Sequence, residues 1–203
     1  MLAKVSCVLF DLGGVIINWH DSWLIDEVSK RFNLSRTHFE QEFMKNLSIL
    51  SSGKMTEGEL WNIIGNRLQS SELERQDSLL GPIFRKFVSV NDSVVKLSRE
   101  VKETGLPIGI LSNTEHITFP IVEELTSLNH FDFKFLSYKI GHVKPSPMIY
   151  QHVIENVPFK KEELIFIDDL ESNVKSANDF GIKTIQFLSY EKLRDDLRMM
   201  KIL

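Results

Sequence analysis

Hydrophobic residues gather in short runs along the chain, and several of these runs end beside polar residues. Four runs are clear: VSCVLF before Asp11, PIGIL before Ser112, ELIFI before Asp168, and KTIQFL near the C-terminus. Each is short and rich in β-branched or aromatic residues, as expected of strands that are buried on both faces. A weaker fifth run, FDFKFLS, covers residues 131–137. The pattern predicts a buried sheet.

Segments with helical spacing of apolar residues lie between these runs. DSVVKLSREVKETG stops at Gly105, a suitable residue just beyond a helix C-terminus. SPMIYQHVIENV begins with Ser146 and Pro147, which suit the N-cap and the first helical position, and ESNVKSANDFG ends at Gly181. Strands that alternate with helices predict βαβ units and a mostly parallel sheet.

Residues 18–90 interrupt this alternation, because they contain helical patterns and no convincing strand. DSWLIDEVSKRF predicts a helix capped by Asp21, and SELERQDSLLGPIFRKF predicts one further helix. Two helices between them carry capping-box spacings, Thr37 with Glu40 and Thr56 with Glu59. We therefore predict an α/β protein with about seventy residues of helices inserted after its first strand.

The composition narrows the classes of partner. The chain has 203 residues, is 42% hydrophobic and 26% charged, and carries a net charge of −4. An acidic balance argues against a nucleic-acid partner, which usually needs a basic face, and favours a cytoplasmic protein. The single cysteine, Cys7, excludes an internal disulfide. No segment approaches the roughly 20 apolar residues of a membrane span, and the N-terminus shows no cleavage-site pattern, so we expect neither a membrane partner nor a signal peptide.

Polar residues follow three of the predicted strands. Ligands of a doubly wound sheet bind outside the carboxyl ends of its strands. The residues placed there, or in the loop between the last two, are Asp11, Ser112, Asn113, Lys144, Asp168 and Asp169. Taken singly, each has an ordinary interpretation, as the start of a turn, a helix cap or a solvated lysine.

Taken together, these residues point to a metal and a phosphate. Three carboxylates that converge at one sheet edge repel each other unless a hard cation lies among them. Mg²⁺ is typically held by one or two carboxylates plus phosphate oxygens of the substrate. The hydroxyl, amide and ammonium groups of Ser112, Asn113 and Lys144 are then suited to hold a phosphate.

The motifs VLFDLGGV, ILSN, VKP and FIDDLESN, in this order, resemble those of the haloacid dehalogenase-like hydrolase superfamily. The resemblance covers nearly the whole chain and implies a Rossmann-like, doubly wound, mostly parallel sheet with an inserted α-helical cap. The expected core domain is 1–17 and 89–203, and the expected cap domain is 18–88. DLGGV, LSNT and KP…IYQHV are similar to the branch that includes the bacterial α-D-glucose-1-phosphate phosphatase type.

The resemblance implies a role for each strand-end residue. Asp11 is the expected nucleophile, which forms an aspartyl-phosphate, and Lys144 is expected to neutralise both it and the transferring phosphoryl group. Ser112 and Asn113 are expected to bind that group. The expected ligands of a Mg²⁺ cofactor are Asp11, Asp169, the main-chain carbonyl of Gly13 and, as a further ligand or a neighbour of the ligands, Asp168.

Gly13 departs from the superfamily pattern. Most phosphatases of the superfamily carry a second aspartate there, two residues after the nucleophile, as general acid and base. We predict a Mg²⁺-dependent phosphatase of a small phosphorylated metabolite, such as a sugar phosphate. Two alternatives stay open. A metal-independent 2-haloacid dehalogenase would leave Asp168 and Asp169 facing each other without a cation, and a non-catalytic binding module would explain the glycine.

The inserted segment is expected to set specificity. Trp19 and His20 lie at its start and are candidates for touching substrate, with His116 a weaker one. Trp23 and Trp61 fit better as buried residues of the cap. The expected partner is a small phosphorylated molecule, and the expected state is a monomer or weak homodimer.

Overall fold

The computed structural model describes residues 4–203, and its central feature is a sheet of five parallel strands. The strands are β1 (Cys7–Phe10), β4 (Ile108–Ser112), β5 (Phe133–Leu136), β6 (Leu164–Asp168) and β7 (Lys183–Gln186). All five hydrophobic runs therefore form strands, including the weakest one. The first three residues of the expected core segment lie outside the described residues.

The direction in which the strands are added changes at β1, which lies at the centre of the order β5-β4-β1-β6-β7. The chain places β4 and β5 on one side of β1, and β6 and β7 on the other. The crevice at such a switch point is where open α/β sheets bind ligands. Asp11 directly follows β1, Ser112 ends β4 and Asp168 ends β6, so all three residues meet at this crevice.

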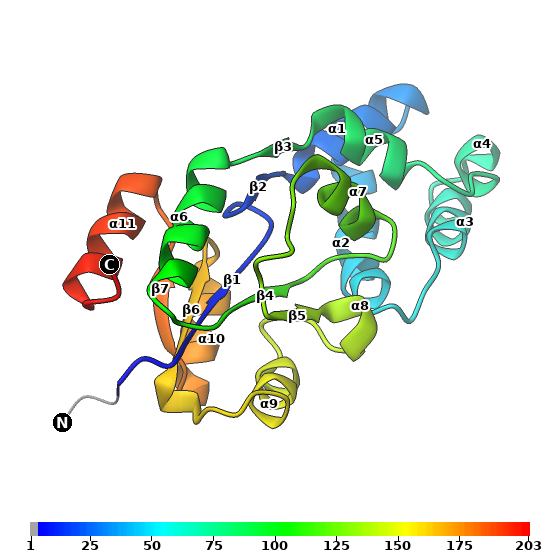
Figure 1. Cartoon of the computed structure of the whole chain (residues 1–203). Helices are drawn as coiled ribbons and strands as arrows, with labels where there is room; N and C mark the ends of the chain where they lie inside the picture. Colours follow the sequence, from blue (N-terminus) through cyan, green and yellow to red (C-terminus); the bar gives the residue numbers. More distant parts are fainter. Residues whose placement is uncertain (1–3) are drawn as a thin grey trace.

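Helices cover both faces of the sheet (Figure 1). On one face, Val8 and Phe10 share a buried cluster with α6 (Asp92–Glu103) and α11 (Tyr190–Met199). On the other face, the alternate residue Leu9 packs with α9 (Pro147–Glu155) and α10 (Glu171–Phe180). Successive side chains of a strand point to opposite faces, so β1 is buried on both. The predicted doubly wound α/β fold is confirmed.

The shorter elements connect these layers. They are α7 (Thr118–Leu125), α8 (Ser137–Ile140) and a 3₁₀ turn, η1 (Lys161–Glu163). Ser146 caps α9 as predicted, since its hydroxyl accepts a hydrogen bond from the main-chain N–H of Met148. The predicted ends of α6 and α10 beside Gly105 and Gly181 are also confirmed.

Five helices between β1 and α6 form a separate group, seen at the upper right of Figure 1. They are α1 (Asp21–Arg31), α2 (Arg36–Ser51), α3 (Glu57–Arg67), α4 (Ser71–Glu74) and α5 (Leu80–Phe87). They enclose their own buried cluster, in which the ring of Trp61 stacks on those of Phe39 and Phe43, with centroids 6.4 Å apart in both pairs. This helical group has a core of its own beside the sheet.

A two-residue antiparallel ladder joins the helical group to the sheet. It pairs β2 (Ile17–Asn18) with β3 (Ser89–Val90), at the two points where the chain enters and leaves the group. The sequence did not predict these strands, because two residues are too few to show a period. Among the described helices, none is long and apolar enough to cross a membrane.

The single helix predicted over residues 71–87 is wrong, because the chain forms α4 and α5 with a break between them. The carboxylate of Glu57 explains the break. It is buried and accepts hydrogen bonds from the main-chain N–H groups of Leu79 and Leu80, where α5 begins. The indole N–H of Trp61 donates to the same oxygen at 2.8 Å.

Two predicted caps are also wrong. Asp21 is the first residue of α1 rather than its N-cap, and His20 in the N-cap position makes no side-chain cap bond. Helix α2 begins earlier than expected, at Arg36, whose guanidinium bonds Glu40 at 2.7 Å. Glu40 therefore does not close a capping box with Thr37. The capping box of Thr56 and Glu59 at the start of α3 is confirmed.

Candidate active site

A cavity of about 450 Å³ lies between the carboxyl ends of the strands and the helical group. Of the predicted residues, Asp11, Gly13, Ser112, Asn113, Lys144 and Asp169 line it, and Asp168 is fully buried beside it. Because these residues come from both sides of β1, the topology alone explains why they meet. We call the sheet-side wall formed by these seven residues the floor of the cavity.

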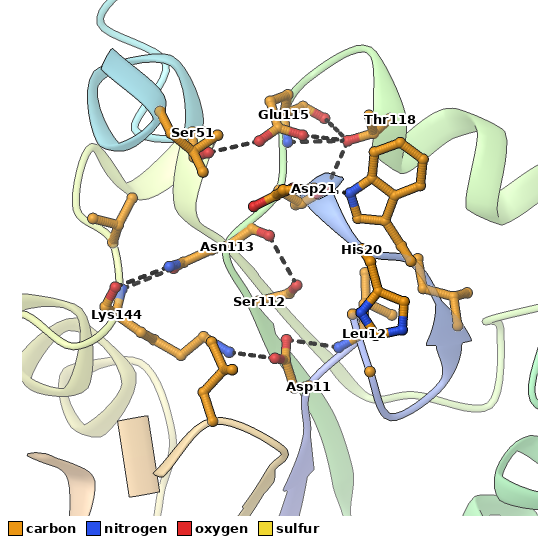
Figure 2. Close-up of a pocket in the computed structure, with 18 of the residues that line it drawn as sticks. Asp11, Leu12, His20, Asp21, Ser51, Ser112, Asn113, Glu115, Thr118 and Lys144 are labelled. Carbon is orange, nitrogen blue, oxygen red and sulfur yellow. Dashed lines mark hydrogen bonds and ion pairs between the residues drawn. The ribbon is translucent and has the colours of Figure 1, made fainter. Parts of the chain in front are cut away.

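The ammonium group of Lys144 contacts the carboxylate of Asp11 on the floor (Figure 2). Its Nζ is 2.8 Å from Oδ2 of Asp11 and 2.6 Å from Oδ2 of Asp168, and it donates to the main-chain carbonyl of Leu111 at 3.1 Å. Lys144 thus bridges two carboxylates that belong to neighbouring strands. Its side chain is almost fully buried, so these three contacts replace its hydration.

Asn113 holds the main chain of Lys144 in place. Its amide nitrogen donates to the carbonyl of Lys144 at 2.9 Å, and its amide oxygen accepts from the N–H of Lys144 at 2.8 Å. Asn113 was expected to bind substrate; it lines the cavity, and in this structure its side chain fixes the lysine. Neighbouring Ser112 is buried, and its hydroxyl donates to the carbonyl of Asn113 at 3.3 Å.

Asp168 is held by donors on every side. Besides Lys144, it accepts from the side-chain amide of Asn173 at 3.0 and 3.1 Å and from the main-chain N–H of Leu170 at 2.9 Å. Asn173 is in turn placed by α10, and its main-chain carbonyl accepts from the hydroxyl of Tyr150. Both oxygens of Asp168 are therefore engaged within the protein, whereas Asp169 faces the cavity.

Gly14 makes room for Asp169. It has φ of +71°, and a Cβ added to it would lie 2.2 Å from Oδ2 of Asp169. Gly13 has no such constraint, because a Cβ there would meet nothing within 4 Å. The two glycines of the first motif therefore differ: Gly14 is required by its conformation and by the carboxylate beside it, and Gly13 borders open space.

Three carboxylates converge at this point with a single ammonium among them. Oxygens of Asp11, Asp168 and Asp169 all lie within 4.8 Å of one another. Burial raises the pKa of Asp11 to about 7, against the opposing effect of Lys144. Burial and the charge of Asp168 also raise the pKa of Asp169. The excess of negative charge and the oxygen donors fit a divalent cation that prefers oxygen ligands.

Lys144 keeps its charge in this setting. Burial opposes that charge, but the carboxylates of Asp11 and Asp168 outweigh the burial and raise the pKa of Lys144. The main-chain N–H of Leu12 also donates to Oδ1 of Asp11 at 2.7 Å, which orients the carboxylate. The floor therefore presents an oriented carboxylate beside a permanent positive charge.

The opposite wall comes mainly from the helical group and its connection to β2. Trp19, His20 and Asp21 line it, as does Phe43 of α2. The indole N–H of Trp19 donates to Asp21 at 3.1 Å, so Asp21 is held toward the cavity instead of capping α1. We call these four residues, with Glu115 and Ser51 described next, the roof of the cavity.

Glu115 completes the roof and is not among the residues predicted from the sequence. It follows β4 by three residues, and its carboxylate accepts from the hydroxyls of Ser51 and Thr118 at 2.6 and 2.7 Å. Burial, and to a smaller extent the charge of Asp21, raise its pKa. Its place in the loop after a strand that ends in Ser112 was a signal that could have identified it. Ser51 carries no such signal, because it lies on a helix remote in sequence.

Two of the aromatic candidates, Trp61 and Trp19, lie where the sequence predicts. Trp61 is fully buried in the helical group, and Trp19 lines the cavity. Trp23 is half-buried and is not among the residues that line the cavity; its ring lies 4.9 Å from that of His20 and 6.2 Å from that of Phe87. His116 is not among the residues that line the cavity; its ring lies 6.4 Å from that of Tyr138.

Comparison with known proteins gives a family match over most of the chain. A family model described as haloacid dehalogenase-like hydrolase matches residues 8–187. The D-ribitol-5-phosphate phosphatase of Bacteroides thetaiotaomicron is 26% identical over 198 residues, which cover 90% of this chain and 91% of that protein. The resemblance inferred from the four motifs is confirmed.

Other relatives share a shorter region or the three-dimensional structure. Bifunctional epoxide hydrolase 2 of Rattus norvegicus is 33% identical over 104 residues, 48% of this chain, and the match spans 18% of that longer protein. A haloacid dehalogenase family enzyme from Bacteroides thetaiotaomicron, solved as a magnesium complex, superposes with a TM-score of 0.73 at 26% identity, over 91% of this chain and 94% of that one.

Proposed function

The chain belongs to the haloacid dehalogenase-like hydrolases, and from this membership we propose that it is a Mg²⁺-dependent phosphatase of a small phosphorylated metabolite. The observation that carries the proposal is the floor of the cavity. There, Lys144 joins Asp11 to Asp168 beside the cavity-facing carboxylate of Asp169. A nucleophile, a fixed positive charge and a metal-binding acid are the parts that phosphoryl transfer to an aspartate requires.

The Mg²⁺ cofactor is supported by the carboxylate cluster and by the magnesium complex of the relative from Bacteroides thetaiotaomicron. We assign Asp11, Asp169 and the main-chain carbonyl of Gly13 as its protein ligands. Asp168 stands next to them and positions Lys144 and Asn173, since both of its oxygens are already engaged. When bound, the ion would supply positive charge to the phosphoryl oxygens.

The protein's own residues supply the rest of the chemistry. Oδ of Asp11 attacks phosphorus, and the bond to the leaving oxygen breaks. Lys144 balances the charge of Asp11 before attack and that of the phosphoryl oxygens during transfer, because its Nζ is in contact with the nucleophile. The hydroxyl of Ser112 lines the cavity and would turn from the carbonyl of Asn113 to donate to a phosphoryl oxygen. Asn113 acts by fixing the main chain of Lys144.

The roof supports a substrate whose leaving group carries no second anion. Asp21 and Glu115 form no ion pair within residues 4–203, and a phosphate or carboxylate beside them would be repelled. Carboxylates and hydroxyls accept hydrogen bonds from sugar hydroxyls, and about 450 Å³ suits one small molecule. We propose a neutral sugar phosphate such as glucose 1-phosphate, with residues 18–88 acting as the cap that selects it.

We also propose a cytoplasmic location and a monomeric or weakly dimeric state. A pI near 5.9 agrees with a freely diffusing cytoplasmic protein. A cavity formed from one chain needs no second copy, in keeping with a monomer or weak homodimer.

Phosphate release from a panel of sugar phosphates and p-nitrophenyl phosphate, with Mg²⁺ and with EDTA, tests the proposal. We expect release that depends on Mg²⁺ and favours a neutral sugar over pyrophosphate. Halide release from 2-halo acids without metal would instead support a dehalogenase. Folded protein that is inactive in both assays would support a binding module.

A further inference from the structure

A phosphatase of this kind needs a proton at the leaving oxygen, and this chain lacks the usual donor. The question rests on the proposed function. The position two residues after Asp11 is Gly13, which has no side chain to donate. Another titratable side chain that lines the cavity must take this role, or the leaving oxygen must depart without help.

The contacts in the cavity leave few candidates for the group that gives a proton to the leaving oxygen. Asp11 is the nucleophile and Asp169 a metal ligand, and Lys144 is committed to two carboxylates. In the roof, Asp21 accepts from Trp19, and Glu115 accepts from hydroxyls at both of its oxygens. Three of these groups lie on the floor, and Glu115 has both oxygens engaged. Asp21 keeps one oxygen open, while the indole of Trp19 holds the other.

His20 has a free proton site and a position away from the phosphoryl-binding floor. Within residues 4–203 its ring makes no hydrogen bond and no ion pair, so both ring nitrogens are open to a ligand, and it lines the cavity across from the floor. Figure 2 shows the imidazole directed toward the segment of Leu12 that follows Asp11. The ring is held edge-on against Trp23, which meets Trp19 in the same way at 5.9 Å. The indole of Trp23 therefore packs against the exposed ring of His20 without using its nitrogens.

The charged groups that face His20 are Asp21, beside it in the chain, and Asp169 on the floor. Burial raises the pKa of Asp21, and the imidazole opposes this rise. His20 and Asp169 line the same cavity, so the ring adjoins the roof and opens toward the metal-binding floor. A group that donates to the leaving oxygen must stand between these two walls.

We propose that His20 is the general acid and base that replaces the missing aspartate. In the first step, Asp11 bonds to phosphorus, the bond to the leaving oxygen breaks, and that oxygen takes a proton from the imidazolium. In the second step, the neutral imidazole takes a proton from water as its oxygen attacks phosphorus and the bond to Asp11 breaks. The net reaction adds one water, and His20 ends protonated as it began.

The test measures the turnover of His20→Gln and of wild type, with Mg²⁺ present, on substrates whose leaving groups differ in acidity. The leaving groups of glycerol phosphate and glucose 6-phosphate are alkoxides, which need a proton. The leaving group of p-nitrophenyl phosphate is p-nitrophenolate, which departs without one. We expect a loss of about 10²- to 10⁴-fold with the alkyl phosphates and less than about tenfold with p-nitrophenyl phosphate. His116→Gln is the matched control, since this histidine does not line the cavity, and it should retain wild-type rates with both.

A second variant separates proton donation from substrate positioning. Gly13→Asp puts a carboxyl into space where a Cβ meets no atom within 4 Å. In the His20→Gln background it should restore alkyl phosphate turnover at least about tenfold, because the new acid takes the usual place. A folded double variant that binds Mg²⁺ but regains no activity would count against proton donation.

The outcomes separate this inference from the proposed function. If wild-type protein releases no phosphate from any substrate with Mg²⁺, the proposed function fails. If wild type is active and His20→Gln loses the same factor with aryl and alkyl phosphates, or loses nothing, the role of His20 is overturned while the phosphatase stands.

Discussion

The floor of the cavity is closed by contacts within the protein, whereas much of its roof is left open to a ligand. On the floor, Lys144, Asp168 and Asn113 use their polar atoms on one another and on main-chain groups. On the roof, His20 has no polar contact within residues 4–203, and Asp21 has a single indole donor. A rigid floor suits chemistry that is the same for every substrate, and an open roof suits selection among substrates.

The largest expected effect lies on the floor, at Asp11. Asp11→Asn replaces the nucleophile with an isosteric amide and should lower phosphate release at least 100-fold, on the scale of losing one catalytic group. Because the amide oxygen can still accept from Leu12, the variant should melt cooperatively near the wild-type temperature. Phosphate release measured beside a thermal melt checks both statements. Retention of more than about a hundredth of wild-type turnover would mean that Asp11 is not the nucleophile.

Asp169→Asn should weaken Mg²⁺ binding at least about tenfold, because it removes a cavity-facing carboxylate from the cluster of three. Its matched control is Asp21→Asn on the roof, which should bind Mg²⁺ like wild type and alter only the ranking of substrates. Calorimetric Mg²⁺ titrations of both variants make the comparison. Equal Mg²⁺ affinity in Asp169→Asn and wild type would remove Asp169 from the metal site.

Gly14→Ala and Gly13→Ala compare two adjacent positions of the floor. Gly14→Ala should cost about 1–2 kcal/mol of unfolding free energy from its left-handed backbone, and should weaken Mg²⁺ binding by displacing Asp169. Gly13→Ala should leave the unfolding free energy within about 0.5 kcal/mol of wild type, because its Cβ meets open space. Urea unfolding of the two variants checks this, and equal midpoints would refute the distinction between the two glycines.

The smallest effect is expected at Glu115 on the roof. Its folded-state pKa is raised by burial, so its protonated form contributes stability that is fully present below the ordinary pKa of 4.5 and is lost as pH rises through the folded value. Glu115→Gln should therefore raise the melting temperature at pH 8, by about 2–4 °C for each kcal/mol gained, and leave it unchanged near pH 4. A stabilisation that is the same at both pH values would contradict this account.

The floor could be predicted from sequence because all of its residues except Lys144 follow buried strands. Ser112 and Asp168 end β4 and β6, and parallel strands bring their carboxyl ends to one edge whatever the intervening chain does. The pairing of Asn113 with the main chain of Lys144 could not be predicted, because it joins residues 31 positions apart.

The roof and its helices depended on contacts that local patterns do not show. Aspartate is a typical N-cap residue, but the indole of Trp19 holds Asp21 toward the cavity. The break between α4 and α5 follows from the carboxylate of Glu57, which lies 22 and 23 positions before the N–H groups that it accepts. Sequence periodicity gives no sign of either contact, because each depends on where a side chain points after folding.

The ladder of β2 and β3 has a consequence for how such proteins diversify. Ile17 pairs with Val90 and Asn18 with Ser89, so the two ends of the intervening helical segment lie side by side. A segment whose ends meet can be lost, lengthened or exchanged as one unit, because the remaining chain closes over a short gap. Selection can then act on the helical segment, which carries most of the roof, as a replaceable module, while the strand ends that carry the chemistry are inherited unchanged.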